Sequence, residues 1–100
     1  MQQLTILGST GSIGVNALDV VAGHPDRFGI FALAAHSSHD KLLQQIQQFR
    51  PRYAVLCDEG AARQLRVQLG SDCTTEVLCG EQALIEVAAA AEVDTVVAAV

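Results

Sequence analysis

The chain has 100 residues, of which 50% are apolar and 17% are charged, and its formal net charge is −5. This length is enough for one domain, and the apolar fraction is enough to bury a hydrophobic core. The negative charge argues against a nucleic-acid partner and against an acidic membrane surface, because both require a basic patch.

The first predicted elements are a strand and a helix joined by a glycine-rich turn. Residues 4–7 form a short apolar run, which predicts a strand. Apolar residues then recur at helical spacing from Ser12 to about Gly23, which predicts a helix. The sequence Gly23-His24-Pro25 ends this helix, since glycine closes a helix and proline cannot continue one.

The rest of the chain repeats this alternation. A strand apolar on both faces is expected over residues 28–34, followed by a loop at residues 35–38. The next helix stops before Pro51 and carries an apolar stripe on one face and four glutamines on the other. The remaining strands are expected over residues 53–57, 75–79 and 94–100. The remaining helices are expected from the cap Asp58 to Gly70 and from Glu81 to about Ala91, with Ala91 facing inward.

This order of elements predicts an α/β fold: a doubly wound parallel sheet (Rossmann-like) of about five strands, with helices on both faces. We expect the strand order 4-3-2-1-5, with strands numbered along the chain. Residues 1–100 are interpreted as one N-terminal domain. Because apolar sequence continues to Val100 and a complete sheet of this type needs a further strand and helix, we expect the domain to belong to a longer protein.

Three glycines spaced three residues apart lie in the first turn, together with the hydroxyl residues Ser9, Thr10 and Ser12. Glycine lets the backbone turn sharply and lets a ligand approach it closely, and the following helix directs free N–H groups at that ligand. The motif predicts a phosphate cradle, and the alternative is a tight turn without a ligand. The predicted contacts are Gly8, Thr10, Gly11, Ser12, Ile13 and Gly14.

The end of the second strand indicates which dinucleotide fits the cradle. NAD-binding folds place an acidic residue there for the ribose 2′-hydroxyl, but this chain has His36, Ser37 and Ser38, with no carboxylate before Asp40. Hydroxyls and free amides can donate hydrogen bonds to a 2′-phosphate, whereas a carboxylate would repel it. These residues therefore favour NADP over NAD. Alternatively, Ser37 or Ser38 only caps the next helix, and His36 is either a cofactor contact or a solvated loop residue.

No residue of the chain is predicted to be catalytic or to bind a metal. The three cysteines lack C-x-x-C spacing and are interpreted as free thiols in a reducing compartment. No secretory signal begins the chain and no stretch approaches about 18 uninterrupted apolar residues, so we expect a cytoplasmic protein without a membrane partner. The glutamates interpreted as solvated residues or helix starts are Glu76, Glu81, Glu86 and Glu92.

Segments along the whole chain resemble the N-terminus of the 1-deoxy-D-xylulose 5-phosphate reductoisomerase family. The segments that carry the resemblance are residues 4–14 (LTILGSTGSIG), 18–21 (LDVV), 24–28 (HPDRF), 50–55 (RPRYAV), 75–84 (TEVLCGEQAL) and 93–100 (VDTVVAAV). The family converts 1-deoxy-D-xylulose 5-phosphate to 2-C-methyl-D-erythritol 4-phosphate in non-mevalonate isoprenoid biosynthesis. It uses NADPH and a divalent metal, Mg or Mn, and is usually homodimeric.

The resemblance implies that residues 10–13 contact the NADPH pyrophosphate and residues 36–38 hold the 2′-phosphate. Many members carry Gly-Lys-Asn where this chain has His36-Ser37-Ser38, so this chain lacks that lysine cation. The family's metal, substrate and lid residues lie beyond position 100. The segment alone is therefore expected to bind no metal and to be inactive.

Two alternatives remain open from the sequence. One is the NADP-binding domain of another dehydrogenase, of the aspartate-semialdehyde dehydrogenase type, which would bring a catalytic cysteine in a second domain. The other is a non-catalytic NADP-binding module that is complete at about this length. In both alternatives the glycine turn has the same role.

Overall fold

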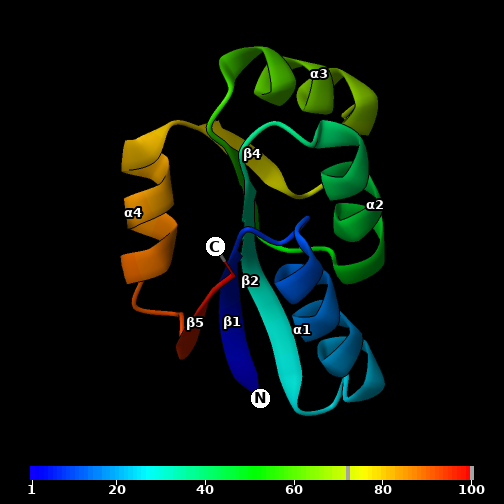
Figure 1. The fold of residues 1–100 in the computed structure, drawn as a ribbon, viewed down its shortest axis with the longest axis vertical. Helices are drawn as coiled ribbons and strands as arrows, with labels where there is room; N and C mark the ends of the chain where they lie inside the picture. Colours follow the sequence, from blue (N-terminus) through cyan, green and yellow to red (C-terminus); the bar gives the residue numbers. More distant parts are fainter. Residues whose placement is uncertain (72, 100) are drawn as a thin grey trace.

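The computed structural model of the chain describes residues 1–71 and 73–99, which form one five-stranded parallel sheet and four helices (Figure 1). The strand order is β4-β3-β2-β1-β5, which confirms the predicted order and the predicted fold class. The elements are β1 Gln2–Leu7, α1 Ser12–Gly23, β2 Phe28–Ala35, α2 His39–Phe49, β3 Tyr53–Leu56, α3 Glu59–Leu69, β4 Glu76–Cys79, α4 Glu81–Ala89 and β5 Thr95–Ala98.

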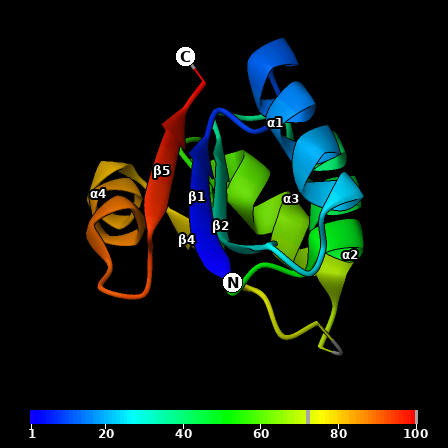
Figure 2. The same cartoon turned by 90° about the horizontal axis from the view of Figure 1, so that it is seen from below.

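The helices lie on both faces of the sheet. Figure 2 shows α1, α2 and α3 on one face and α4 on the other. Strands β1 to β4 step across the sheet in one direction, so right-handed connections place three helices on the same face. The connection from β4 returns to the far side of β1, and the same handedness therefore places α4 on the opposite face.

Strand β2 is the centre of the core. Ile30 and Leu33 belong to the apolar cluster under α1, α2 and α3, whereas Phe31 and Ala34 belong to the cluster under α4. The pairing register with β1 shifts between Leu4 and Thr5, which leaves Phe31 as an extra residue in β2. Burial on both faces explains why this strand is apolar at nearly every position.

A buried hydroxyl attaches α4 to the sheet. The Thr5 side chain is 0% exposed, and its Oγ1 donates a hydrogen bond to the Val87 carbonyl oxygen at 3.1 Å. Because a buried hydroxyl without a partner destabilises the folded state, this bond explains why a polar residue is tolerated in β1.

Several predicted boundaries are corrected. Helix α4 ends at Ala89, since Ala90 has an extended backbone with ψ of 141°, and Ala91 is therefore exposed instead of facing inward. Ser38 occupies the N-cap position of α2, but neither it nor Ser37 makes a capping side-chain hydrogen bond. The prediction that β5 reaches Val100 falls partly outside the described residues. Within the described part of the chain, no helix is both long and apolar enough to cross a membrane.

Candidate functional site

The backbone of the glycine turn (residues 8–14) is hydrogen-bonded to the end of β2. Gly8 has a φ of 81°, a conformation that favours glycine, and it turns the chain as β1 ends. The Ala34 carbonyl oxygen accepts hydrogen bonds from the amides of both Gly8 and Ser9, at 2.8 and 2.9 Å. The Gly11 amide donates to the Gly8 carbonyl oxygen at 3.2 Å, which closes the turn.

Gly14 is required by close packing. A Cβ atom at this position would collide with the Gly8 carbonyl oxygen and would lie 2.6 Å from Ser9 Cα. Both neighbours are backbone atoms, so α1 can begin this close to the turn only with glycine here.

Neither backbone strain nor close packing requires a glycine at position 11. Its φ is −79°, which any residue adopts, and an added Cβ would meet only the Gly8 carbonyl oxygen at an ordinary 3.6 Å. Gly11 is exposed to solvent. A glycine in this position leaves the surface of the turn open to a ligand, which is the role that the motif predicts.

The N-terminus of α1 is open. Gly11 is its N-cap and offers no side chain, and no acidic residue lies in its first turn. The first helical hydrogen bond runs from the Val15 amide to the Gly11 carbonyl oxygen at 2.9 Å, so the amides of Ser12 and Ile13 precede it. By contrast, α3 has the Asp58 carboxylate as its cap, 2.8 Å from the Ala61 amide nitrogen. The α1 N-terminus thus keeps the amides and positive dipole end that bind anions.

The other predicted contacts lie at the end of the neighbouring strand. His36, Ser37 and Ser38 are all exposed directly after β2. Their backbone is held in place, since the His36 carbonyl oxygen accepts from the Asp58 amide at 3.0 Å. As β1 and β2 are parallel neighbours, the structure brings this loop and the glycine turn to the same edge of the sheet.

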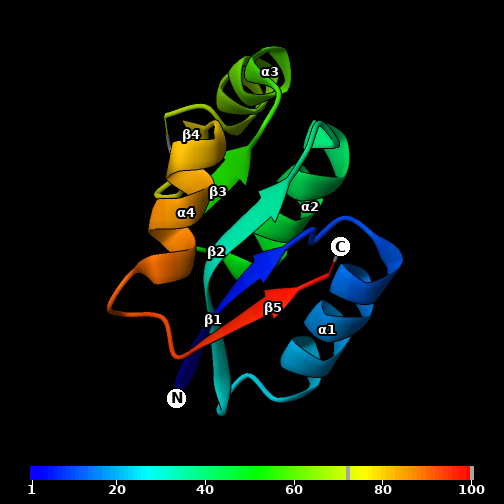
Figure 3. The same cartoon turned by 60° about the vertical axis from the view of Figure 1, so that its left-hand side comes forward.

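Figure 3 shows β5 beside β1, on the side away from β2. The chain direction across the sheet therefore reverses at β1, and ligands of doubly wound folds bind at the carboxyl ends of strands at such a point. The glycine turn follows the carboxyl end of β1 and lies at this position.

Two functional candidates on α2 were missed by the sequence analysis. Thr10 of the turn and Lys41 and Gln45 of α2 line one groove of about 310 Å³ between α1 and α2. Gln45 is half-buried and makes two hydrogen bonds to Ser9. The four glutamines of α2 have the pattern of a polar helix face, and no signal in the sequence distinguishes Gln45 from the others.

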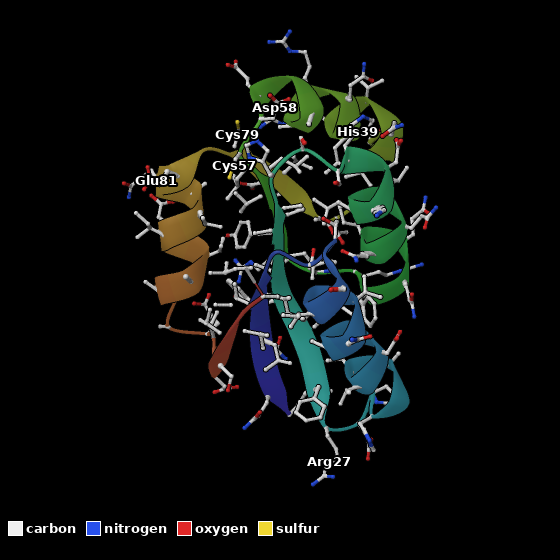
Figure 4. All side chains as sticks on the ribbon, in the orientation of Figure 1. Arg27, His39, Cys57, Asp58, Cys79 and Glu81 are labelled. Carbon is white, nitrogen blue, oxygen red and sulfur yellow. The ribbon has the colours of Figure 1, made fainter. Side chains whose placement is uncertain are left out.

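The described residues contain no group of three or more His, Cys, Asp or Glu side chains that could hold a metal ion. All four glutamates singled out above are exposed, and the three cysteines are free. Figure 4 shows Cys57 and Cys79 close together at the ends of β3 and β4, where Cys79 Sγ lies 3.8 Å from the Cys57 carbonyl oxygen. This thiol pair lies outside the glycine turn.

Known proteins match the sequence of this chain along its whole length. A family model described as 1-deoxy-D-xylulose 5-phosphate reductoisomerase matches residues 4–100. Proteins with that name from Saccharophagus degradans and Laribacter hongkongensis are 54% and 52% identical to the chain; each match covers 100% of this chain and 26% of the relative. The chain therefore spans about a quarter of the length of these relatives.

Solved structures agree with the sequence comparisons. A DOX-P reductoisomerase in complex with NADPH, fosmidomycin and magnesium has a TM-score of 0.91 at 41% identity, covering 100% of this chain and 24% of that chain. The 1-deoxy-D-xylulose 5-phosphate reductoisomerase from Zymomonas mobilis in complex with NADPH has a TM-score of 0.84 at 30% identity, covering 91% of this chain and 24% of that chain. The chain belongs to the 1-deoxy-D-xylulose 5-phosphate reductoisomerase family.

Proposed function

We propose that this chain is the NADPH-binding part of an enzyme that converts 1-deoxy-D-xylulose 5-phosphate to 2-C-methyl-D-erythritol 4-phosphate. The observation that carries the proposal is the open N-terminus of α1, where the N-cap is Gly11, no side chain caps the helix and no acidic residue lies in the first turn. The two related structures in complex with NADPH support the same assignment. The family match favours this function over an aspartate-semialdehyde dehydrogenase type and over a non-catalytic module.

The glycine turn is proposed to hold the pyrophosphate of NADPH. The amides of Ser12 and Ile13 donate to phosphate oxygens, and the hydroxyls of Thr10 and Ser12, two residues of the same turn, are further donors. Gly8 and Gly14 shape the backbone around the ligand, and Gly11 lets the phosphate approach.

The loop after β2 is proposed to hold the 2′-phosphate. His36, Ser37 and Ser38 are exposed there, and the start of α2 follows them directly. Hydroxyl and ring N–H donors suit a phosphate better than a ribose hydroxyl.

In the proposed mechanism these residues bind and orient the dinucleotide but do not touch the reacting sugar. NADPH supplies the hydride for the reduction, and the chain fixes the cofactor at the carboxyl edge of the sheet. The sugar phosphate, the divalent metal (Mg or Mn) and the residues that hold them belong to the remainder of the enzyme, so the segment alone is inactive.

The remaining parts of the proposal concern the whole protein. We place it in the cytoplasm, a reducing compartment that suits its three free cysteines. Its homodimeric state follows from the family resemblance.

A charge placed in the turn tests the proposed function. In the full-length protein, Gly11→Asp puts a carboxylate where the pyrophosphate is proposed to lie, and we expect NADPH affinity to fall by at least about 100-fold, or ~2.7 kcal/mol. Gly23→Asp is the matched control, because it adds the same side chain to open space at the other end of α1. If both variants bind NADPH as tightly as the parent, the turn does not hold the cofactor.

A further inference from the structure

One side chain of α2 is bonded to the glycine turn through both atoms of its amide. Ser9 Oγ donates to Gln45 Oε1 at 2.8 Å, and Gln45 Nε2 donates to the Ser9 carbonyl oxygen at 2.8 Å. The two residues are 36 positions apart in the sequence, so this contact forms only when α2 packs against the turn. The bond to the carbonyl fixes the amide orientation, because a flipped amide would place Gln45 Oε1 against the Ser9 carbonyl oxygen, two acceptors without a proton between them.

The anchored residue, Ser9, lies near the start of the turn. Ser9 is 0% exposed, follows Gly8, and precedes Thr10, the first hydroxyl proposed to reach the pyrophosphate. Its amide is held by Ala34 of β2, and its hydroxyl and carbonyl are held by Gln45. Gln45 therefore fixes the peptide that joins Ser9 to Thr10.

The same helix carries the other half of the proposed site. Helix α2 begins at His39, immediately after the residues proposed for the 2′-phosphate. A shift of α2 relative to the turn would change the separation of the two phosphate positions, and the Gln45–Ser9 contact opposes that shift. The groove lined by Thr10, Lys41 and Gln45 runs between α1 and α2.

We propose that Gln45 is a positioning residue for NADPH. It acts through Ser9 to hold the pyrophosphate turn in its binding conformation and at a fixed distance from the 2′-phosphate loop. This inference rests on the proposed NADPH function.

The test compares cofactor binding with turnover in the full-length protein. Gln45→Met keeps the side-chain length but removes both hydrogen bonds. We expect the NADPH dissociation constant and the KM for NADPH to rise about tenfold. The kcat at saturating NADPH and the KM for the sugar phosphate stay within about twofold, because the reacting atoms are not touched. Gln47→Met is the matched control: Gln47 is exposed on the same helix and lines a different cavity, and its replacement leaves all four values unchanged.

A second variant tests whether Gln45 acts through Ser9. Ser9→Ala removes the hydroxyl bond but leaves the bond from Gln45 Nε2 to the Ser9 carbonyl oxygen, so a smaller loss of NADPH affinity, of about threefold, is expected. The double variant binds NADPH no more weakly than Gln45→Met alone, since Gln45→Met already removes the bond that Ser9→Ala removes. Fully additive losses contradict the proposed route.

Three outcomes separate the two proposals. A Gln45→Met protein with a lower melting temperature but the parent's NADPH affinity overturns the positioning role and leaves the proposed function standing. A parent protein that does not bind NADPH overturns both. Loss of NADPH affinity in Gln45→Met, with Gln47→Met unchanged, supports both.

Discussion

Replacing Gly11 with alanine is expected to weaken NADPH binding without destabilising the fold. The backbone of Gly11 suits alanine, and the added methyl group meets only one atom, at 3.6 Å. Reduced entropy of the unfolded chain stabilises such a variant by about 0.4–1 kcal/mol, and the poorer N-cap preference of alanine costs a similar amount. The free energy of unfolding should therefore change by less than about 1 kcal/mol.

Replacing Gly14 with alanine is expected to have a different effect. The methyl group would overlap the Gly8 carbonyl oxygen and lie 2.6 Å from Ser9 Cα, so the turn or α1 has to move. Overpacking of this kind costs about 1–3 kcal/mol of folding free energy. The Gly11 variant therefore tests ligand contact, and the Gly14 variant tests folding stability.

Urea unfolding and NADPH fluorescence titration of the full-length protein measure the two effects. For Gly11→Ala we expect at least about a tenfold loss of NADPH affinity, or ~1.4 kcal/mol, because the methyl group covers amides proposed to bind phosphate. Gly23→Ala, in open space at the end of α1, is the control. Unchanged NADPH affinity in Gly11→Ala would refute the ligand argument, and parent-like stability of Gly14→Ala would refute the packing argument.

Three further predictions use other residues. Ser37→Lys places a cation beside the proposed 2′-phosphate and should tighten NADPH binding by about 1 kcal/mol with no effect on NADH; equal effects in calorimetry on both cofactors would place the 2′-phosphate elsewhere. Thr5→Val leaves the buried Val87 carbonyl oxygen without its donor and should cost about 1–2 kcal/mol in urea unfolding, whereas no change would mean that the bond contributes nothing. Asp58→Ala removes the α3 cap at Ala61 and should cost about 1 kcal/mol while leaving NADPH affinity unchanged; a parent-like melting temperature would contradict this.

The fold was predictable because its signals are local. Apolar runs, helical spacing and glycine or proline stops located the elements, and the alternation of strands and helices indicated a parallel sheet. The expected strand order 4-3-2-1-5 agrees with the structure. The predictions failed where packing decides the outcome. The extended backbone of Ala90 ends α4 before Ala91, although the apolar pattern continues. Ser38 has a typical capping residue type, yet its side chain does not cap.

The sequence indicated only the backbone part of the candidate site. The sequence pattern identified the glycine turn, and the structure adds why Gly8 and Gly14 are needed there. The contact between Gln45 and Ser9 depends on how α2 packs against the turn, across 36 positions of sequence. A polar residue on a helix face gives the same sequence pattern whether its side chain is solvated or hydrogen-bonded to another part of the protein. Only the structure therefore reveals this contact.

The turn from Gly8 to Gly14 and the loop at residues 36–38 are proposed to bind NADPH together. Calorimetric titration of the full-length protein with NADPH and then NADH tests this proposal most directly. We expect saturable binding, with NADPH bound at least about tenfold more tightly than NADH. Absence of NADPH binding, or tighter binding of NADH, would contradict it.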